Sequence, residues 1–198
     1  MPPQYICILG NSGSGKSYLA KALASSFSPP LSCIHLDHVY FDTSAPRASG
    51  RLLRRPEPEK QALCAAALAA APPTGWVSEG VFGELVQHFL SAAPAPPTLL
   101  WLAMPWPLCE SRLRTRRDNL GACGPDTAES TEQLAAWAAA YYTRTDPRSA
   151  AGHEEMLKAH AGAVALRSEA EVEVFLAACA EAGGDVRAVA AGWAAREA

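Results

Sequence analysis

Residues 10–17, Gly-Asn-Ser-Gly-Ser-Gly-Lys-Ser, are the part of the chain whose types and spacing are best suited to chemistry. They match the pattern G-x-x-x-x-G-K-[ST], which binds phosphate groups. The glycines allow successive backbone amides to turn toward one anion, and a helix that begins near Lys16 adds its positive end. Lys16 is expected to reach the β- and γ-phosphates and Ser17 to ligate Mg²⁺. We therefore predict ATP and Mg²⁺ as cofactors, held by Gly10, Asn11, Ser12, Gly13, Ser14, Gly15, Lys16, Ser17 and Tyr18.

Two acidic residues follow predicted strands. Asp37 comes directly after the apolar run 32–36, and Glu79 lies at the end of the run 76–80. Ligands of parallel sheets bind at the carboxyl ends of the strands, so both side chains are expected in the same cleft as residues 10–17. The alternative for each is a turn or capping carboxylate.

Apolar runs and helix-favouring runs alternate along the chain. Strands are predicted at 4–9, 32–36, 76–80, 98–103 and 163–166, and helices at 16–27, 59–71, 82–92, 106–117, 130–143, 168–183 and 185–198. Ser168 with Glu171, and Ser130 with Gln133, have the spacing of a capping box at a helix start. The alternation predicts an α/β fold with a parallel sheet.

Composition excludes several classes of protein. The 198 residues are 49% hydrophobic and 19% charged, which is typical of a globular domain. The net charge of −3 gives no general attraction to nucleic acid, and no run is long enough for a membrane span. The six cysteines form no C-x-x-C pair, and no export signal precedes them, so we expect reduced thiols in the cytoplasm.

The motifs together resemble a known family. Residues 8–17, the HLD at 35–37, Glu79-Gly80 and LAMPWPLCESRLRTRR at 102–117 are similar to the nucleoside-monophosphate-kinase-like P-loop proteins, and most of all to the bacterial topology-modulation, adenylate-kinase-related group. The resemblance extends from about residue 6 to 176. It implies a three-layer P-loop NTPase fold with a five-stranded parallel sheet, helices on both faces and a small arginine-rich lid, all in one domain, 1–198.

The resemblance also implies roles for several side chains. Asp37 would hold Mg²⁺ through water or accept a proton from the acceptor, and Glu79 would contact the metal, although the family more often has Asp-Gly there. Arg112 and Arg116, four residues apart on one helix face, would begin a lid at about 112–148 that returns at Arg144 and Arg148. One would stack on the base and another would neutralise the transferring phosphoryl group. The alternative is a solvated basic helix face.

The segment of about 38–72 is expected to bind the phosphoryl acceptor. Its arginines, with Arg51, Arg54 and Arg55 as the main candidates, would suit an anion such as a nucleoside monophosphate, and Tyr40 would line the site. The D-G-F-P-R acceptor motif of adenylate kinases is absent. Trp76, Trp101 and Trp137 are interpreted as core residues.

Three functions follow from these expectations. The first is an ATP-dependent kinase for a nucleoside monophosphate, as a monomer or homodimer. The second is a kinase for a hydroxyl of a nucleoside, sugar or coenzyme precursor, which a true base at Asp37 would favour. The third is a nucleotide-dependent regulatory or DNA-associated protein, against which the acidic net charge argues.

Overall fold

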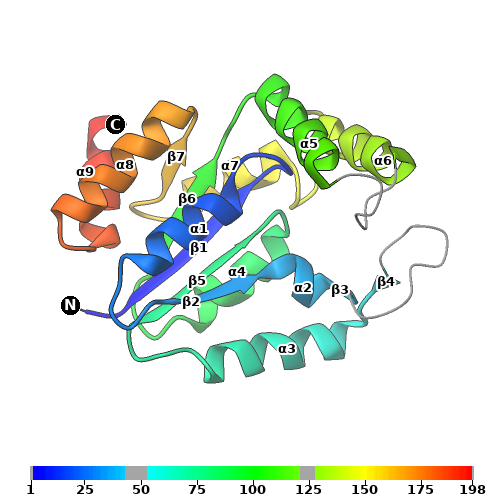
Figure 1. Cartoon of the computed structure of the whole chain (residues 1–198). Helices are drawn as coiled ribbons and strands as arrows, with labels where there is room; N and C mark the ends of the chain where they lie inside the picture. The colour runs from blue at the N-terminus through cyan, green and yellow to red at the C-terminus, as the bar shows by residue number, and fades with distance from the viewer. Residues whose placement is uncertain (1, 43–52, 121–127, 198) are drawn as a thin grey trace.

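A five-stranded parallel sheet forms the centre of the computed structural model, which describes residues 2–42, 53–120 and 128–197 (Figure 1). The strands lie in the order β2-β5-β1-β6-β7. Their bounds are β2 Ser32–His35, β5 Gly75–Gly80, β1 Gln4–Gly10, β6 Thr98–Leu102 and β7 Val164–Leu166. Both neighbours of β1 run parallel to it, and its apolar residues are fully buried, as in a strand covered on both faces. The predicted fold class is confirmed.

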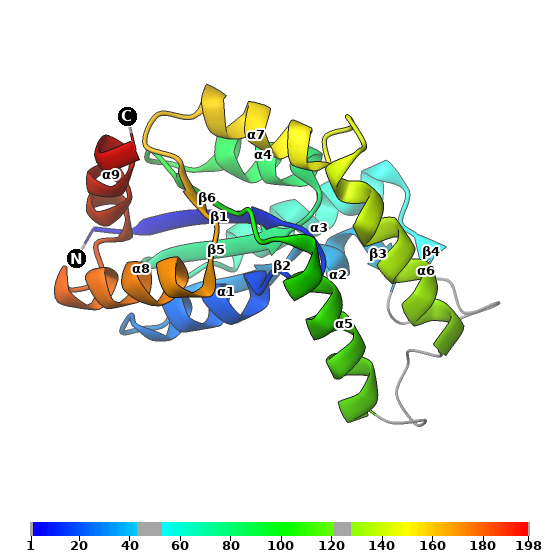
Figure 2. The ribbon, with the colours of Figure 1, turned by 90° about the horizontal axis from the view of Figure 1, so that it is seen from above.

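Helices cover the two faces of this sheet, so the molecule has three layers (Figure 2). On one face lie α1, α8 and α9, and on the other α3, α4 and α7. Their bounds are α1 Lys16–Ser25, α8 Glu169–Glu181, α9 Val186–Glu197, α3 Glu57–Ala69, α4 Gly83–Ala92 and α7 Ala150–Ala159. Each face buries its own apolar cluster, which supplies most of the driving force for folding.

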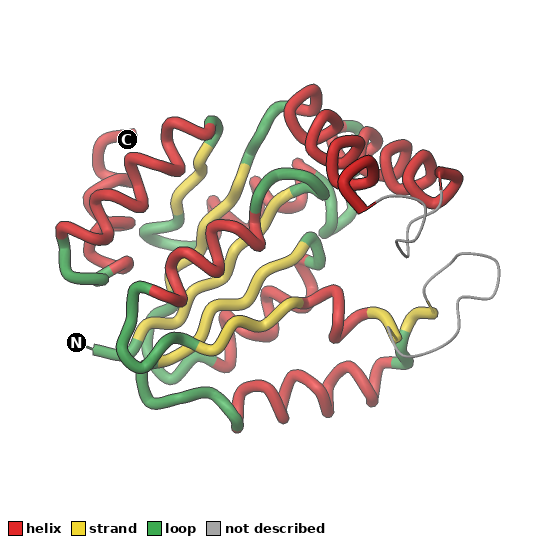
Figure 3. Tube along the Cα trace, viewed as in Figure 1, coloured by secondary structure: helices red, strands yellow, loops and turns green. Residues whose placement is uncertain are grey.

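Two further helices project beyond the edge of the sheet where its strands end (Figure 1, Figure 3). They are α5, Trp106–Leu120, and α6, Ala128–Ala139, which packs against α5 and continues into the 3₁₀ turn η2, Ala140–Tyr142. The middle of the predicted lid, 121–127, lies outside the described residues. On the other side of the cleft, α2, Leu36–Tyr40, leads into a two-stranded ribbon of β3, Phe41–Asp42, and β4, Leu53–Arg54.

Several elements differ from the sequence prediction. The helices α2 and α7 and the ribbon of β3 and β4 were not predicted, and α6 begins at Ala128, before the predicted capping residue Ser130. The cap predicted for α8 is present, because the Ser168 hydroxyl accepts a hydrogen bond from the Glu171 amide at 3.2 Å. In the part of the chain that the structure describes, no helix has the length and apolar character that a membrane crossing requires.

Candidate active site

The strand registers bring the predicted site residues to one edge of the sheet. In the pairing of β1 with β5, Ile8 lies beside Glu79 and Leu9 beside Gly80, and in the pairing of β2 with β5, His35 also lies beside Glu79. The phosphate-binding loop therefore leaves β1 next to Glu79. Asp37 lies two residues after the last residue of β2, at the same edge of the sheet.

The loop 10–17 has the backbone that the glycine pattern predicts. Gly13 and Gly15 have φ values of +80° and +99°, which residues with a Cβ rarely adopt. A Cβ on Gly13 would also clash with the carbonyl of Cys109 on α5, so the loop lies directly against that helix. The Asn11 side chain donates to the Ala138 carbonyl at 2.8 Å and ties the loop to the end of α6. Such a loop, followed by the amino end of α1, fits the triphosphate of a nucleotide.

Lys16 folds back over this loop. Its Nζ donates a hydrogen bond of 2.9 Å to the Asn11 carbonyl. Desolvation lowers the pKa of the Lys16 ammonium, while the nearby carboxylates of Glu79 and Asp37 oppose that shift. The lysine is therefore held among groups of opposite charge at the place where phosphates are expected.

Ser17, at the end of the loop 10–17, is in contact with Glu79. The Ser17 hydroxyl donates to Glu79 Oε1 at 2.9 Å, and the His35 imidazole contacts the same oxygen through Nδ1 at 2.6 Å. Glu79 is 6% exposed. A serine hydroxyl with the carboxylates of Glu79 and Asp37 provides the hard oxygen ligands that Mg²⁺ prefers, with room for water and phosphate as further ligands.

Asp37 lies in the first turn of α2 rather than at the strand end itself. Its side chain reaches solvent, but the protein atoms around it desolvate the carboxylate and raise its pKa, against the attraction of Lys16. Glu79 also raises the pKa of Asp37, since the two carboxylates repel each other. A carboxylate with a raised pKa is better suited to accept a proton than an ordinary aspartate.

Arg112 and Arg116 come from α5. Arg112 Nη1 donates to the carbonyls of Ser14 at 3.0 Å and Gly13 at 3.3 Å, and its Nη2 forms an ion pair with Glu169 at 2.5 Å. Arg112 therefore contacts the backbone of the loop 10–17 from its outer side. Arg116 lies close enough to Lys16 and Asp37 to lower the pKa of both groups.

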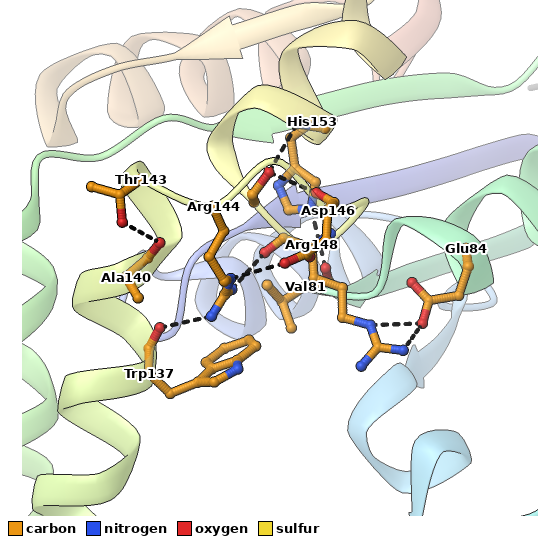
Figure 4. A network of polar contacts seen from close by, with 11 residues as sticks. Val81, Glu84, Trp137, Ala140, Thr143, Arg144, Asp146, Arg148 and His153 are labelled. Atoms are coloured by element: carbon orange, nitrogen blue, oxygen red, sulfur yellow. Dashed lines mark hydrogen bonds and ion pairs between the residues drawn. The ribbon is translucent and has the colours of Figure 1, made fainter.

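Arg144 and Arg148 follow η2, and Figure 4 shows Arg144 beside Trp137 and Arg148 pointing toward Glu84. The Arg144 guanidinium stacks over the Trp137 ring at 4.2 Å, donates to the Trp137 and Arg148 carbonyls, and forms an ion pair with Asp146 at 3.1 Å. Arg148 is paired with Glu84, to which its Nε donates at 2.7 Å.

The remaining predicted side chains are spread over the acceptor segment and α1. Arg55 is bound to Glu59 and to Asp42, so its charge is already compensated by protein carboxylates. Arg54 is exposed, with its guanidinium 5.8 Å from the Tyr40 ring, and Arg51 lies outside the described residues.

Two predicted tyrosines have opposite surroundings. Tyr40 is buried and stacks on Phe82 at 4.2 Å, which forms an aromatic wall beside the site. Tyr18 is 58% exposed and donates toward Glu173 of α8 at 3.2 Å, so it lies on the outer side of α1.

The sequence analysis missed a buried chain of hydrogen bonds behind the site. The Trp101 indole donates to the Tyr141 hydroxyl at 2.9 Å, that hydroxyl lies 2.8 Å from His153 Nδ1, and His153 Nε2 lies 3.1 Å from the Val81 carbonyl. Val81 comes directly after Glu79 and Gly80, so these hydrogen bonds hold in place the turn that follows Glu79. Trp137, interpreted as a core residue, is half-buried: it packs against the apolar cluster on the α3, α4 and α7 side of the sheet and also lies under the Arg144 guanidinium.

Comparison with known proteins places the fold. No family model matches the chain, and no curated protein matches it by sequence. Among solved structures, a gluconokinase from Sinorhizobium meliloti 1021 matches with a TM-score of 0.52 at 18% identity, over 91% of this chain and 95% of that one. Shikimate kinase from Acinetobacter baumannii matches with a TM-score of 0.51 at 16% identity, over 91% and 92%.

A sugar kinase from Janibacter sp. HTCC2649 matches with a TM-score of 0.50 at 16% identity, over 95% of this chain and 98% of that one. These matches extend over nearly the whole chain in each case. At this level of identity they establish that the chain has the fold of P-loop kinases.

Proposed function

We propose that this protein is a Mg²⁺-dependent phosphotransferase that moves the γ-phosphoryl group of ATP to a small-molecule acceptor. The observation that carries the proposal is the meeting of three groups at one edge of the sheet: the loop 10–17, the pair Ser17–Glu79, and Asp37. Phosphoryl transfer needs positioning and charge neutralisation more than covalent chemistry, and these groups supply both.

Each side chain has a distinct task in this reaction. The loop amides and Lys16 would bind the triphosphate, and Ser17, Glu79 and Asp37 would hold Mg²⁺, which neutralises phosphate charge when bound. Arg116 would add positive charge next to Lys16. Asp37 would orient the acceptor and, if the acceptor is a hydroxyl, take its proton.

Two acceptor classes have support. The exposed Arg54 beside Tyr40 favours an anion such as a nucleoside monophosphate, as the resemblance to the adenylate-kinase-related group implies. The position of the Asp37 carboxylate in the first turn of α2, close to Lys16 and Glu79, favours a hydroxyl acceptor instead, because a carboxylate there can take the proton of a hydroxyl. The solved structures of similar fold are named for gluconate, sugar and shikimate kinases, which is consistent with the second class. A cytoplasmic location and a monomeric or homodimeric state remain predictions.

The proposal is tested in two steps. Calorimetry of the purified protein with Mg-ATP should give a binding isotherm that the Lys16→Ala variant loses. ADP release, followed by a coupled assay, should then rise above the acceptor-free rate with one class of acceptor. Intact protein that binds no ATP, or that binds ATP but releases no more ADP with any nucleotide, nucleoside or sugar, would contradict the proposal.

A further inference from the structure

A cavity of about 270 Å³ lies between the end of α6 and the start of α4 (Figure 4). Its lining includes neither the loop 10–17 nor Asp37 or Glu79, but it does include Arg144 and Arg148, which the sequence analysis assigned to the returning side of the lid. The residues around it are Glu84, Trp137, Arg144, Asp146, Pro147 and Arg148. Its volume lies just below the range of about 300–1,000 Å³ that is usual for small-molecule sites, and its lining combines an aromatic ring with charged side chains that can form hydrogen bonds.

The walls of the cavity are tied to the reaction site. Trp137 adjoins Ala138, whose carbonyl accepts the Asn11 hydrogen bond from the phosphate loop. Arg148 lies over the Tyr40 ring at 4.5 Å, and Tyr40 is one helical turn after Asp37. These contacts place the cavity beside the loop and the base, where a phosphoryl acceptor has to enter.

A second wall leads back to Glu79. Arg148 also lies 5.4 Å from the Phe82 ring, and Phe82 follows Glu79 by three residues. The stacked rings of Tyr40 and Phe82 join the two segments into one surface. The cavity lining therefore contacts, through Arg148, two aromatic rings that come three residues after Asp37 and Glu79.

The charges in the cavity lining are balanced. Arg148 is paired with Glu84, and Arg144 with Asp146, so two cations face two carboxylates. Trp137 adds an aromatic surface that Arg144 holds in place. An anionic ligand would meet repulsion from Glu84 and Asp146 and would compete with them for the arginines.

We propose that this cavity binds the phosphoryl acceptor, and that the acceptor is an uncharged polyhydroxylated molecule, such as a sugar or polyol. Carboxylate oxygens of Glu84 would accept hydrogen bonds from its hydroxyl groups, Arg148 would donate to its oxygens, and the apolar face of the molecule would pack on Trp137. The inference rests on the proposed phosphotransferase function.

The reaction balances with this acceptor. An acceptor hydroxyl oxygen forms a bond to the γ-phosphorus of ATP while the bond from that phosphorus to the β–γ bridging oxygen breaks. The bridging oxygen keeps the electron pair and leaves as part of ADP. The hydroxyl proton passes to the Asp37 carboxylate and from there to solvent. No other reactant is needed.

Binding is tested first, without ATP. Neutral hexoses, pentoses, polyols, nucleosides, nucleoside monophosphates and sugar acids are added in separate arms. At least one free neutral sugar or polyol should change the tryptophan fluorescence of the wild-type protein in a saturable way. The Trp137→Phe variant should lose that change. The control variant Trp193→Phe, at a half-buried indole packed on α8, should keep it. A response confined to nucleoside monophosphates or sugar acids, or the absence of any response, overturns the inference.

Catalysis is tested with Glu84→Gln, which keeps the shape of the side chain and removes its charge. With the best neutral acceptor, KM should rise about 10- to 100-fold, the loss expected for a hydrogen bond to a charged group, while kcat changes little. If the acceptor is anionic, KM falls instead, because a repulsive charge is gone. Glu110→Gln is the matched control, since Glu110 has a side chain 35% exposed, against 36% for Glu84, and is also paired with an arginine.

The two proposals fail in different ways. Loss of the phosphotransferase function would appear as absent Mg-ATP binding in calorimetry, whatever the fluorescence response to sugars. Intact ATP binding combined with a preference for anionic acceptors would overturn the acceptor inference alone. Glu84→Gln is checked for folding by circular dichroism and thermal melting. If it does not fold, the fluorescence measurements on Trp137→Phe and Trp193→Phe still test whether the cavity binds the acceptor.

Discussion

Replacement of His153 by glutamine should reduce the loss of unfolding free energy that the protein undergoes at acid pH. Burial lowers the pKa of His153 from 6.5 to about 4, with smaller opposing contributions from the Val81 carbonyl and Asp146. The carbonyl can only accept, so Nε2 carries the proton and Nδ1 accepts from the Tyr141 hydroxyl. A second proton on His153 would break this arrangement. The folded state therefore requires the neutral imidazole.

The size of the effect follows from the two pKa values. Because the unfolded chain binds the proton more readily, the contribution of His153 is complete above pH 6.5 and is lost progressively as the pH falls toward 4. Between pH 7.5 and pH 5 the wild-type protein should lose about 2 kcal/mol of unfolding free energy through this residue. Urea titrations at a series of pH values measure that loss directly.

The comparison between variants separates His153 from other titrating groups. His153→Gln should be less stable than wild type at pH 7.5, because hydrogen bonds are lost, but its stability should fall about 2 kcal/mol less on acidification. Tyr141→Phe removes a neighbouring hydroxyl and leaves the imidazole, so it should retain most of the acid dependence. If His153→Gln and wild type lose stability in parallel between pH 7.5 and pH 5, the imidazole is not buried in the neutral form and the reasoning is wrong.

Three further predictions concern the site. Lys16→Ala should weaken Mg-ATP binding by at least about tenfold in calorimetry, and unchanged affinity would remove the lysine from the phosphate site. Asp37→Asn should lower kcat about 10²- to 10⁴-fold for a hydroxyl acceptor at saturating ATP, and a loss below threefold would argue against a proton-accepting role. Gly162→Ala, at φ +75° with open space around it, should cost about 1–2 kcal/mol in thermal unfolding, whereas Gly13→Ala, at φ +80° against the Cys109 carbonyl, should cost more and also abolish ATP binding. Equal losses in the two glycine variants would show that the contact with α5 is unimportant.

The phosphate loop could be predicted from the sequence because its chemistry is local. The residues of the motif all lie within 10–17, and the strand before it and the helix after it follow from short-range patterns. The contacts of the loop with Cys109, Arg112 and Ala138 could not be predicted in this way. The parallel sheet could also be predicted, because a chain in which strands and helices alternate has few other possible topologies. The pair Ser17–Glu79 then depends only on strand ends meeting at one edge.

The helix α7 could not be predicted, because tertiary contacts override its local preferences. It contains Gly152, which is unfavourable inside a helix. A Cβ at that position would clash with the backbone of Asp146 and Pro147, so the glycine is required by close packing rather than by a turn. Gly83 at the start of α4 approaches the Pro147 carbonyl in the same way. The contacts of Gly152 are with residues five and six positions earlier and that of Gly83 is with a residue 64 positions later, and neither leaves a periodic pattern in the sequence.

The position of Asp37 in a helix, rather than at a bare strand end, explains how the reaction site and the cavity are connected. Asp37 and Tyr40 are three residues apart in α2, and Glu79 and Phe82 are three residues apart after β5. Each acidic residue is thus followed at the same distance by an aromatic ring, and the two rings stack at 4.2 Å. Arg148 lies over both rings and is paired with Glu84. A shift of the segment 144–148 would therefore move Tyr40 and Phe82, each of which is three residues from one of the two carboxylates. If the cavity binds the acceptor as we propose, binding there would be linked to Asp37 and Glu79 through these contacts, which a carboxylate at a bare strand end would not provide.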